Sequence, residues 1–146
     1  MNIKFRKCTL EDFDFLFKLK KDNFKIYVDK IWGWNDEDQI ERMRIDFEET
    51  LEQKQIIIFN DVEIGVFSFY MLENDVCRIN EINILKEYQR KGIGSYILEK
   101  KLQENSENSI KTILQVFKDN PAFKLYKRLG FEVYEETETH YRMEKI

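Results

Sequence analysis

Helical and alternating hydrophobic patterns divide the chain into an early helical part and a later part rich in strands. A first strand is predicted at Ile3–Lys7, and Thr9 with Asp12 has the spacing of a helix capping box. Apolar residues then recur at helical spacing. A second, less regular helical segment is expected over about Asn23–Trp32, and a third from about Asp36 to Gln53.

The pattern changes to strands after these helices. Ile56–Phe59 and Val62–Met71 are predicted strands joined by a tight turn at Asn60-Asp61, and Val76–Ile84 is a third. The remaining predicted elements are a helix from Ile93 to about Glu104, a strand at Ile110–Phe117, a helix at Pro121–Leu129 stopped by Gly130, and strands at Phe131–Glu136 and Thr139–Lys145.

This order predicts an α+β fold. The strand–helix–strand unit from Val76 to Phe117 should be parallel and right-handed, inside an otherwise mostly antiparallel mixed sheet flanked by helices. No repeat, linker or low-complexity tract interrupts the pattern. We therefore expect a single domain over residues 1–146.

Composition narrows the possible partners. Lys and Arg number 24 against 28 Asp and Glu, a net charge of −4, which argues against a nucleic-acid partner. The apolar run Ile56–Phe59 is far too short to cross a bilayer, and the first residues lack the apolar stretch of a signal peptide, so a cytoplasmic location without membrane contact is expected. Two Cys and one His provide no metal cluster.

The sharpest local signal lies between a predicted strand and a predicted helix. It is the run Gln89-Arg90-Lys91-Gly92-Ile93-Gly94. Glycines allow successive backbone N–H groups to point into one concavity, and the helix start adds a positive dipole, which suits a pyrophosphate. The alternative is a plain strand–helix turn that uses glycine only for geometry.

Two motifs favour the phosphate interpretation. Glu81–Gly94 resembles motif A of the GNAT superfamily of N-acetyltransferases, with its [QR]xxGx[GA] signature, and Asn120–Phe131 is similar to the NxxAxxLYxxxGF of motif B. The segment Tyr27–Trp34 also resembles that of an uncharacterised bacterial subgroup with the pattern YVxxxWGW. Together these motifs identify the chain as similar to GNAT enzymes.

The resemblance implies acetyl-CoA as the donor co-substrate and a primary amine as the acceptor. It assigns donor contacts to the backbone of Ile84 and Leu85, the amides of Gln89, Arg90, Lys91, Gly92, Ile93, Gly94 and Ser95, the side chain of Asn120, and Tyr126 near the thioester sulfur. Lys86 stands where many members have proline.

Two residues are catalytic candidates. CoA leaves as a thiolate with a pKa of about 8.5, and the Tyr126 phenol could protonate it; the alternative is a core tyrosine. The acceptor ammonium must lose a proton, and Glu81 is the expected base. A carboxylate is a weak base for this task, so burial or a relaying water is needed. Alternatively, Glu81 is a solvated charge or binds the substrate cation.

The region Tyr27–Glu37 is the candidate acceptor site. Tyr27, Trp32 and Trp34 could form aromatic walls for a cationic amine, with nearby carboxylates as ion partners. The competing interpretation is a helix–loop–helix corner in which the indoles only pack. His140, on a predicted terminal strand, is interpreted as a structural or exposed histidine rather than a catalytic one.

The sequence leaves three hypotheses for function. The first is an acetyl-CoA-dependent N-acetyltransferase working by direct attack in a ternary complex, on a small-molecule or peptide amine, with a homodimer possible. The second is a non-catalytic acyl-CoA-binding or regulatory module on the same fold, which would be expected to lose Tyr126 and Glu81. The third is a structural protein whose glycine turn binds nothing.

Overall fold

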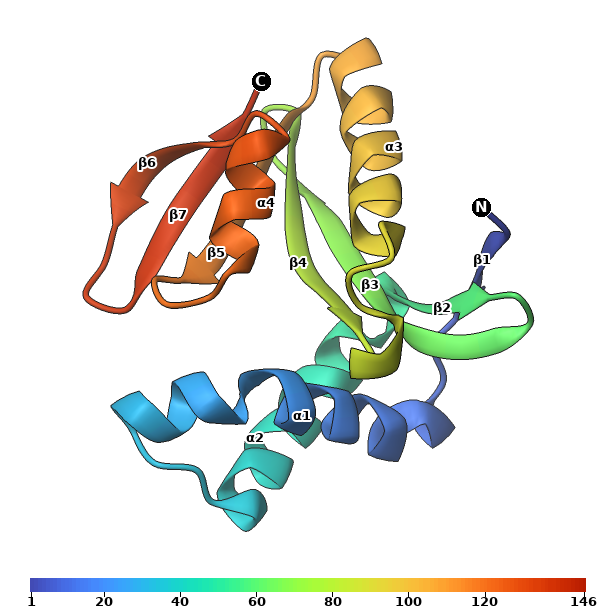
Figure 1. Ribbon diagram of the computed structural model, residues 1–146, viewed down its shortest axis with the longest axis vertical. Helices are drawn as coiled ribbons and strands as arrows, with labels where there is room; N and C mark the ends of the chain where they lie inside the picture. Colours follow the sequence, from blue (N-terminus) through green and yellow to red (C-terminus); the bar gives the residue numbers. More distant parts are fainter. The chain divides into compact units, whose positions relative to one another are not determined.

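The computed structural model describes residues 1–146 and contains four α-helices and seven strands (Figure 1). In chain order the elements are β1 (Ile3–Lys7), the 3₁₀ helix η1 (Leu10–Asp12), α1 (Phe13–Ile31), α2 (Asp36–Thr50), η2 (Leu51–Gln53), β2 (Lys54–Phe59), β3 (Val62–Leu72), β4 (Val76–Ile84), η3 (Lys86–Tyr88), α3 (Ile93–Glu107), β5 (Lys111–Phe117), α4 (Ala122–Arg128), β6 (Glu132–Glu136) and β7 (His140–Lys145). Every predicted strand is present.

The strands form one mixed sheet in the order β1-β2-β3-β4-β5-β7-β6. The β4–β5 pair is parallel, with Val76–Arg78 beside Lys111–Ile113, whereas β1–β2, β2–β3, β5–β7 and β6–β7 are antiparallel. The predicted α+β class, with a parallel strand–helix–strand unit inside a mostly antiparallel sheet, is confirmed.

The early helices differ from the prediction. The two segments expected before Trp32 are one continuous helix, α1, because no glycine or proline interrupts the chain between its two halves. The third predicted helix ends at Thr50 and continues as the 3₁₀ turn η2. The helix expected to stop at about Glu104 extends to Glu107.

The chain divides into two compact units. The first comprises Met1–Ser68 with Glu81–Lys91, and the second comprises Phe69–Asn80 with Gly92–Ile146. Both β3 and β4 contribute residues to each unit. No helix is long and apolar enough to span a membrane.

The first unit has its own hydrophobic core, to which α1 and α2 contribute together with strand residues. The two helices lie against each other (Figure 1). Its buried members come from α1, α2, β2, β3 and the segment after β1: Cys8, Phe13, Leu16, Leu19, Met43, Phe47, Ile56 and Val66. The Phe13 and Phe47 rings meet edge to face at 5.4 Å, which fixes α1 on α2.

The predicted capping box is confirmed. The backbone N–H of Thr9 donates to Asp12 Oδ2 at 2.8 Å, and Arg6 contacts both Asp12 at 2.8 Å and Glu63 at 2.9 Å. The hydrogen bond from the Arg6 guanidinium lowers the pKa of the buried Asp12 carboxyl below its usual range. This network connects β1, the start of the helical region and β3.

In the second unit, α3 and α4 pack on the same face of the sheet. Asn105 of α3 donates to the Thr112 hydroxyl on β5 at 2.9 Å, and the Phe123 ring of α4 lies 4.8 Å from the Tyr141 ring on β7. Val116 is the cross-strand partner of Tyr141, so Thr112, Val116 and Tyr141 share one face by strand alternation.

Candidate active site

The predicted phosphate-binding turn has the backbone of an anion nest. Arg90 (φ 61°) and Gly92 (φ 80°) both adopt the left-handed conformation, and α3 begins directly after Gly92. Alternation of this kind turns successive N–H groups to one side, at the positive end of a helix. Ile93 is buried, so only its backbone can serve a ligand there.

A bulge in β3 positions the strand end that precedes this turn. The β2–β3 register shifts between Ile57 and Ile58, and the Ile64 carbonyl accepts the Leu85 N–H at 2.8 Å. A Cβ on Gly65 would collide with the Asn83 carbonyl. The glycine therefore permits a close approach of β3 to β4 that fixes the end of β4.

The Ile84 carbonyl is engaged by two side-chain amides. Asn23 Nδ2 on α1 donates to it at 3.1 Å, and Gln89 Nε2 donates to it at 2.7 Å. Gln89 Nε2 also lies 3.1 Å from Asn23 Oδ1. Three of the expected donor-binding residues, Ile84, Leu85 and Gln89, are thus brought together at one end of the first unit.

Glu81 belongs to a polar cluster in the first unit. Its carboxylate lies 3.3 Å from Lys54 Nζ and accepts from Asn83 Nδ2 at 2.9 Å. The Lys54 side chain is only 4% exposed and that of Glu81 18%, so Glu81 is not a solvated charge. Burial lowers the pKa of Lys20, an effect that the charges of Glu81 and Asp46 oppose.

Asn120 caps the short helix of motif B. Its Oδ1 accepts the Ala122 N–H at 2.9 Å, and its own N–H donates to the Phe117 carbonyl at 3.0 Å. Its carbonyl accepts the Phe123 N–H at 3.1 Å. This bond orients the Asn120 side chain, whose Nδ2 group carries two N–H donors that could contact a ligand.

Tyr126 lies on α4 with its ring edge to face against the buried Phe131 ring, 5.9 Å away. Gly130 (φ 98°) ends the helix, with the Phe131 N–H donating to the Tyr126 carbonyl at 3.0 Å, as in a Schellman motif. Burial raises the pKa of Tyr126 to about 12. The phenol therefore keeps its proton at neutral pH.

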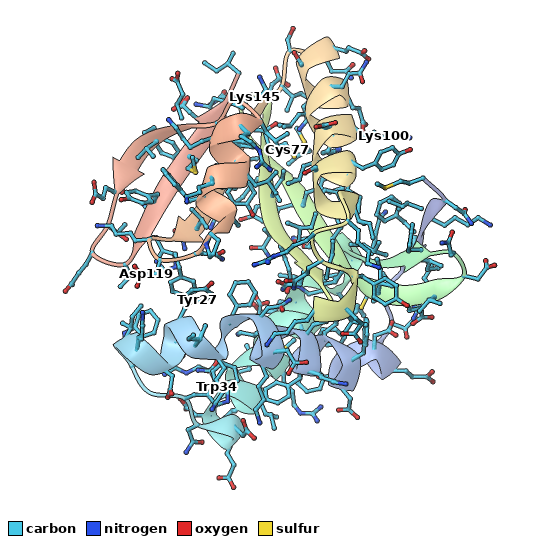
Figure 2. All side chains as sticks on the ribbon, viewed as in Figure 1. Tyr27, Trp34, Cys77, Lys100, Asp119 and Lys145 are labelled. Carbon is cyan, nitrogen blue, oxygen red and sulfur yellow. The ribbon has the colours of Figure 1, made fainter.

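The three acceptor candidates occupy different environments. Trp34 is half-buried, with its ring 6.3 Å from Phe17 and its Nε1–H donating to Asp36 at 2.6 Å. Trp32 is 64% exposed. Tyr27 is half-buried and extends from α1 on the side away from Trp34 (Figure 2). Trp34 thus fits the packing interpretation, and the three rings do not form one wall.

His140 has the contacts of a structural residue. Its ring lies 4.2 Å from that of Phe117, and its Nδ1 is 2.6 Å from the Thr139 hydroxyl. Burial, together with the charge of Arg142, lowers the pKa of His140 below its ordinary value of 6.5. The ring is therefore neutral near pH 7 and packs against an aromatic neighbour.

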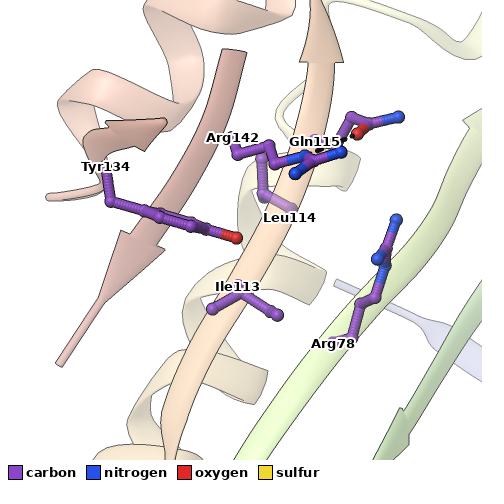
Figure 3. A pocket seen from close by; sticks show the side chains of 6 residues that line it. All are labelled: Arg78, Ile113, Leu114, Gln115, Tyr134 and Arg142. Carbon is purple, nitrogen blue, oxygen red and sulfur yellow. Dashed lines mark hydrogen bonds between the residues drawn. The ribbon is translucent and has the colours of Figure 1, made fainter. Parts of the chain in front are cut away.

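Two cavities lie in the second unit, away from the expected site residues. One has a volume of about 10 Å³, enough for a single water molecule, and is lined by Arg78, Ile113, Leu114, Gln115, Tyr134 and Arg142 (Figure 3). The other, of about 320 Å³, lies between the C-terminal half of α3 and Lys145. No three His, Cys, Asp or Glu side chains gather as a metal site.

Comparison with known proteins assigns the chain to a family whose fold agrees with the architecture described above. The mixed sheet, with its parallel strand–helix–strand unit, has the architecture of the acetyltransferase class of α+β enzymes. The acetyltransferase (GNAT) domain model matches residues 52–133. The chain belongs to the GNAT superfamily of N-acetyltransferases.

Solved structures share this fold. The PaiA N-acetyltransferase from Thermoplasma acidophilum, in complex with coenzyme A, is 21% identical with a TM-score of 0.75, and 99% of each chain is covered. Naa50 from Arabidopsis thaliana, in complex with the bisubstrate analogue CoA-Ac-MVNAL, is 22% identical with a TM-score of 0.68, covering 100% of this chain and 99% of Naa50. No curated protein sequence matches the chain.

Two residues of this region were not anticipated from the sequence. Asn23 meets Gln89 and Ile84 across more than sixty positions of chain, so no local pattern indicates it. Lys54 had a detectable signal: strand alternation places it on the same buried face as Ile56. A lysine on such a face needs an anionic partner, and Glu81 is that partner.

Proposed function

We propose that the protein transfers the acetyl group of acetyl-CoA to a primary amine by direct attack within a ternary complex. The observation that carries this proposal is the left-handed turn at Arg90 and Gly92, which opens into the N-terminus of α3 in a chain of the GNAT superfamily. A nest of N–H groups at a helix start fits a pyrophosphate. Arg90 and Lys91 add positive charge beside it.

The rest of the donor is assigned by position along the chain. The backbone of Ile84 and Leu85 would face the pantetheine arm, and Asn120 Nδ2 would contact it from the start of α4. Acetyl-CoA supplies an acyl group activated as a thioester. The protein binds and orients this group and moves protons around it.

Three proton movements are required. The acceptor ammonium has a pKa of about 10.4, so it must lose a proton before its nitrogen bonds to the acetyl carbon. Glu81 accepts this proton through a relaying water, while Lys54 holds the carboxylate in place. As the carbon–sulfur bond breaks, the Tyr126 phenol protonates the leaving thiolate. The nitrogen, now bonded to the acetyl carbon, loses its further proton to solvent as the amide forms, and the phenolate regains a proton from solvent.

The cysteines support direct attack rather than an acyl-enzyme intermediate. Cys8 and Cys77 are both buried. Burial raises the pKa of Cys8 to about 12 and also raises that of Cys77. Both thiols therefore stay protonated at neutral pH and are poor nucleophiles.

The acceptor is an amine held near the end of α1. Trp32 presents an exposed indole, and Tyr27, five residues earlier in the chain, a half-buried ring. Asp29 and Glu37 supply nearby negative charge for an ammonium. Peptide amines join small amines as candidates because Naa50, a protein of similar fold, was solved with a CoA–peptide bisubstrate analogue.

One experiment separates the enzyme from a non-catalytic acyl-CoA-binding module. The protein is incubated with acetyl-CoA and a panel of polyamines, aminoglycosides, and peptides with a free N-terminus or lysine, and release of free CoA is measured. A thermal shift with acetyl-CoA accompanies the panel, because a ligand at 100 times its Kd stabilises a protein by about 2.7 kcal/mol. CoA release supports the enzyme. A thermal shift without CoA release by any acceptor supports the non-catalytic module. If neither a thermal shift nor CoA release is seen, donor binding is overturned.

A further inference from the structure

Asn23 connects three elements of the first unit. From α1 its Nδ2 reaches the Ile84 carbonyl at 3.1 Å, while its Oδ1 accepts from Gln89 Nε2 at 3.1 Å. Gln89 itself donates to the same carbonyl at 2.7 Å. We call Asn23, Gln89 and the Ile84 carbonyl the amide clasp. It fastens the helix that leads to the acceptor segment onto the strand end that leads to the phosphate turn.

The clasp occupies the polar groups that the proposed donor arm would use. A carbonyl oxygen has two lone pairs, and Asn23 and Gln89 together take both on Ile84. The neighbouring Leu85 N–H already donates to the Ile64 carbonyl at 2.8 Å. A pantetheine amide can therefore donate to Ile84 only when one side-chain amide leaves.

Asn23 is the amide that should leave. Its hydrogen bond to Ile84 is 3.1 Å long, whereas that of Gln89 is 2.7 Å. Gln89 also lies in the turn whose geometry the pyrophosphate would hold, while Asn23 needs only a change of side-chain rotamer on a stable helix. Exchange at Asn23 keeps the turn intact.

We propose that Asn23 is a positioning residue that competes with the donor arm for the Ile84 carbonyl and thereby couples donor binding to helix α1. This inference rests on the proposed function, because it takes acetyl-CoA as the molecule that displaces Asn23. When the donor is absent, the clasp ties α1 to β4. When the donor is bound, Asn23 is released and α1 loses that tie.

The chain contains its own reporters of this change. Its two tryptophans are Trp32, at the end of α1, and Trp34, whose ring lies 6.3 Å from Phe17 of α1. Release of α1 alters the surroundings of both indoles. Tryptophan emission therefore reports on α1 without any knowledge of the acceptor.

The experiment uses Asn23→Ala, Asn23→Leu, and the control Lys18→Ala on the exposed side of α1. Leucine keeps the bulk of asparagine but donates no hydrogen bond, and both variants suit a helix. CoA is titrated calorimetrically and by tryptophan emission, with thermal unfolding measured for each protein. We expect CoA to bind both Asn23 variants about threefold to tenfold more tightly, because a competing hydrogen bond is gone.

The emission change that CoA causes in the native chain and in Lys18→Ala should be absent in both Asn23 variants. If folded Asn23 variants bind CoA with unchanged or weaker affinity, Asn23 is structural and the proposal is overturned. It is also overturned if CoA binds the native chain without changing its emission. Failure of the proposed function is a different result, in which CoA does not bind the native chain at all.

Discussion

The proposed phosphate turn and the proposed acceptor segment keep their shapes by different means. The turn from Gln89 to Gly94 is defined by backbone conformation, with left-handed residues at Arg90 and Gly92. The segment from Tyr27 to Glu37 is held by side chains, through the Phe17–Trp34 contact and the hydrogen bond from Trp34 to Asp36. A backbone site binds a group common to all donors, whereas a side-chain site can vary its ligand. Substitutions in the two regions should therefore act on different kinetic constants.

The largest expected effect concerns the leaving group on the donor side. Tyr126→Phe removes only the hydroxyl, so the contact with the Phe131 ring remains. We expect kcat to fall by about 10²–10⁴-fold with little change in donor affinity, as is typical for loss of a general acid. Steady-state kinetics under conditions where chemistry limits the rate provide the test. An unchanged kcat would reduce Tyr126 to a packing residue.

The same variant has a signature in stability. Because burial raises the pKa of Tyr126 to about 12, the folded protein keeps the phenol proton above the ordinary value of 10, where the unfolded chain loses it. The contribution of the buried, protonated phenol to the free energy of unfolding is fully present below pH 10 and is lost as the pH rises toward 12. Denaturation midpoints between these values should fall less steeply for Tyr126→Phe than for the native chain.

The next effect tests the backbone of the turn. Gly92→Val places a β-branched side chain at φ 80°, which L-residues rarely adopt, so the nest should lose its shape. We expect acetyl-CoA affinity to fall about 10–100-fold while the acceptor KM changes little. Calorimetric titration measures the affinity, and Gly33→Ala, also at positive φ but outside the turn, is the matched control. Full affinity in a folded Gly92→Val protein contradicts the pyrophosphate assignment.

A smaller effect is expected on the acceptor side. Trp32 is 64% exposed, and a cation over an exposed indole contributes about 0.5–1 kcal/mol. Trp32→Ala should raise the acceptor KM about twofold to fivefold and leave acetyl-CoA affinity unchanged. The measurement requires the best acceptor from the panel. A changed donor affinity would show that the two regions are not separable.

The smallest kinetic effect belongs to Trp34. Its ring packs on Phe17 and its N–H is bound to Asp36, so Trp34→Ala should cost about 1–3 kcal/mol of stability. The folded protein should retain its kinetic constants within about twofold. Thermal unfolding and kinetics on the same sample decide the matter. A raised acceptor KM without lost stability would show that Trp34 contacts the acceptor.

The fold was predictable where local physics dominates. The Asn60-Asp61 turn, the Gly130 stop and the Thr9–Asp12 box depend on neighbours in the sequence, and each appears where it was expected. The prediction of two separate early helices was wrong. The irregular apolar stripe in Asn23–Trp32 suggested a second helix, although nothing in this segment interrupts α1.

The candidate site was predictable only in part. The glycines in the sequence indicate the backbone geometry of the turn. The ion pair of Glu81 with Lys54, on another strand, and the hydrogen bond of Gln89 with Asn23, on a helix, have no such local signal. Such pairs depend on how distant elements pack, which composition and spacing do not encode. The sequence therefore indicated the candidate residues Glu81 and Gln89 but not the partners that contact them, Lys54 and Asn23.

The burial of both thiols has a practical consequence for the assay. Cys8 is 7% exposed and Cys77 is fully buried, and both stay protonated at neutral pH. Disulfide reagents react with thiolates, so the folded protein should contribute almost no colour of its own to a thiol-reagent assay. Each equivalent of chromophore then counts one molecule of CoA released. Acceptor panels can be followed continuously, in unmodified protein and without a coupling enzyme.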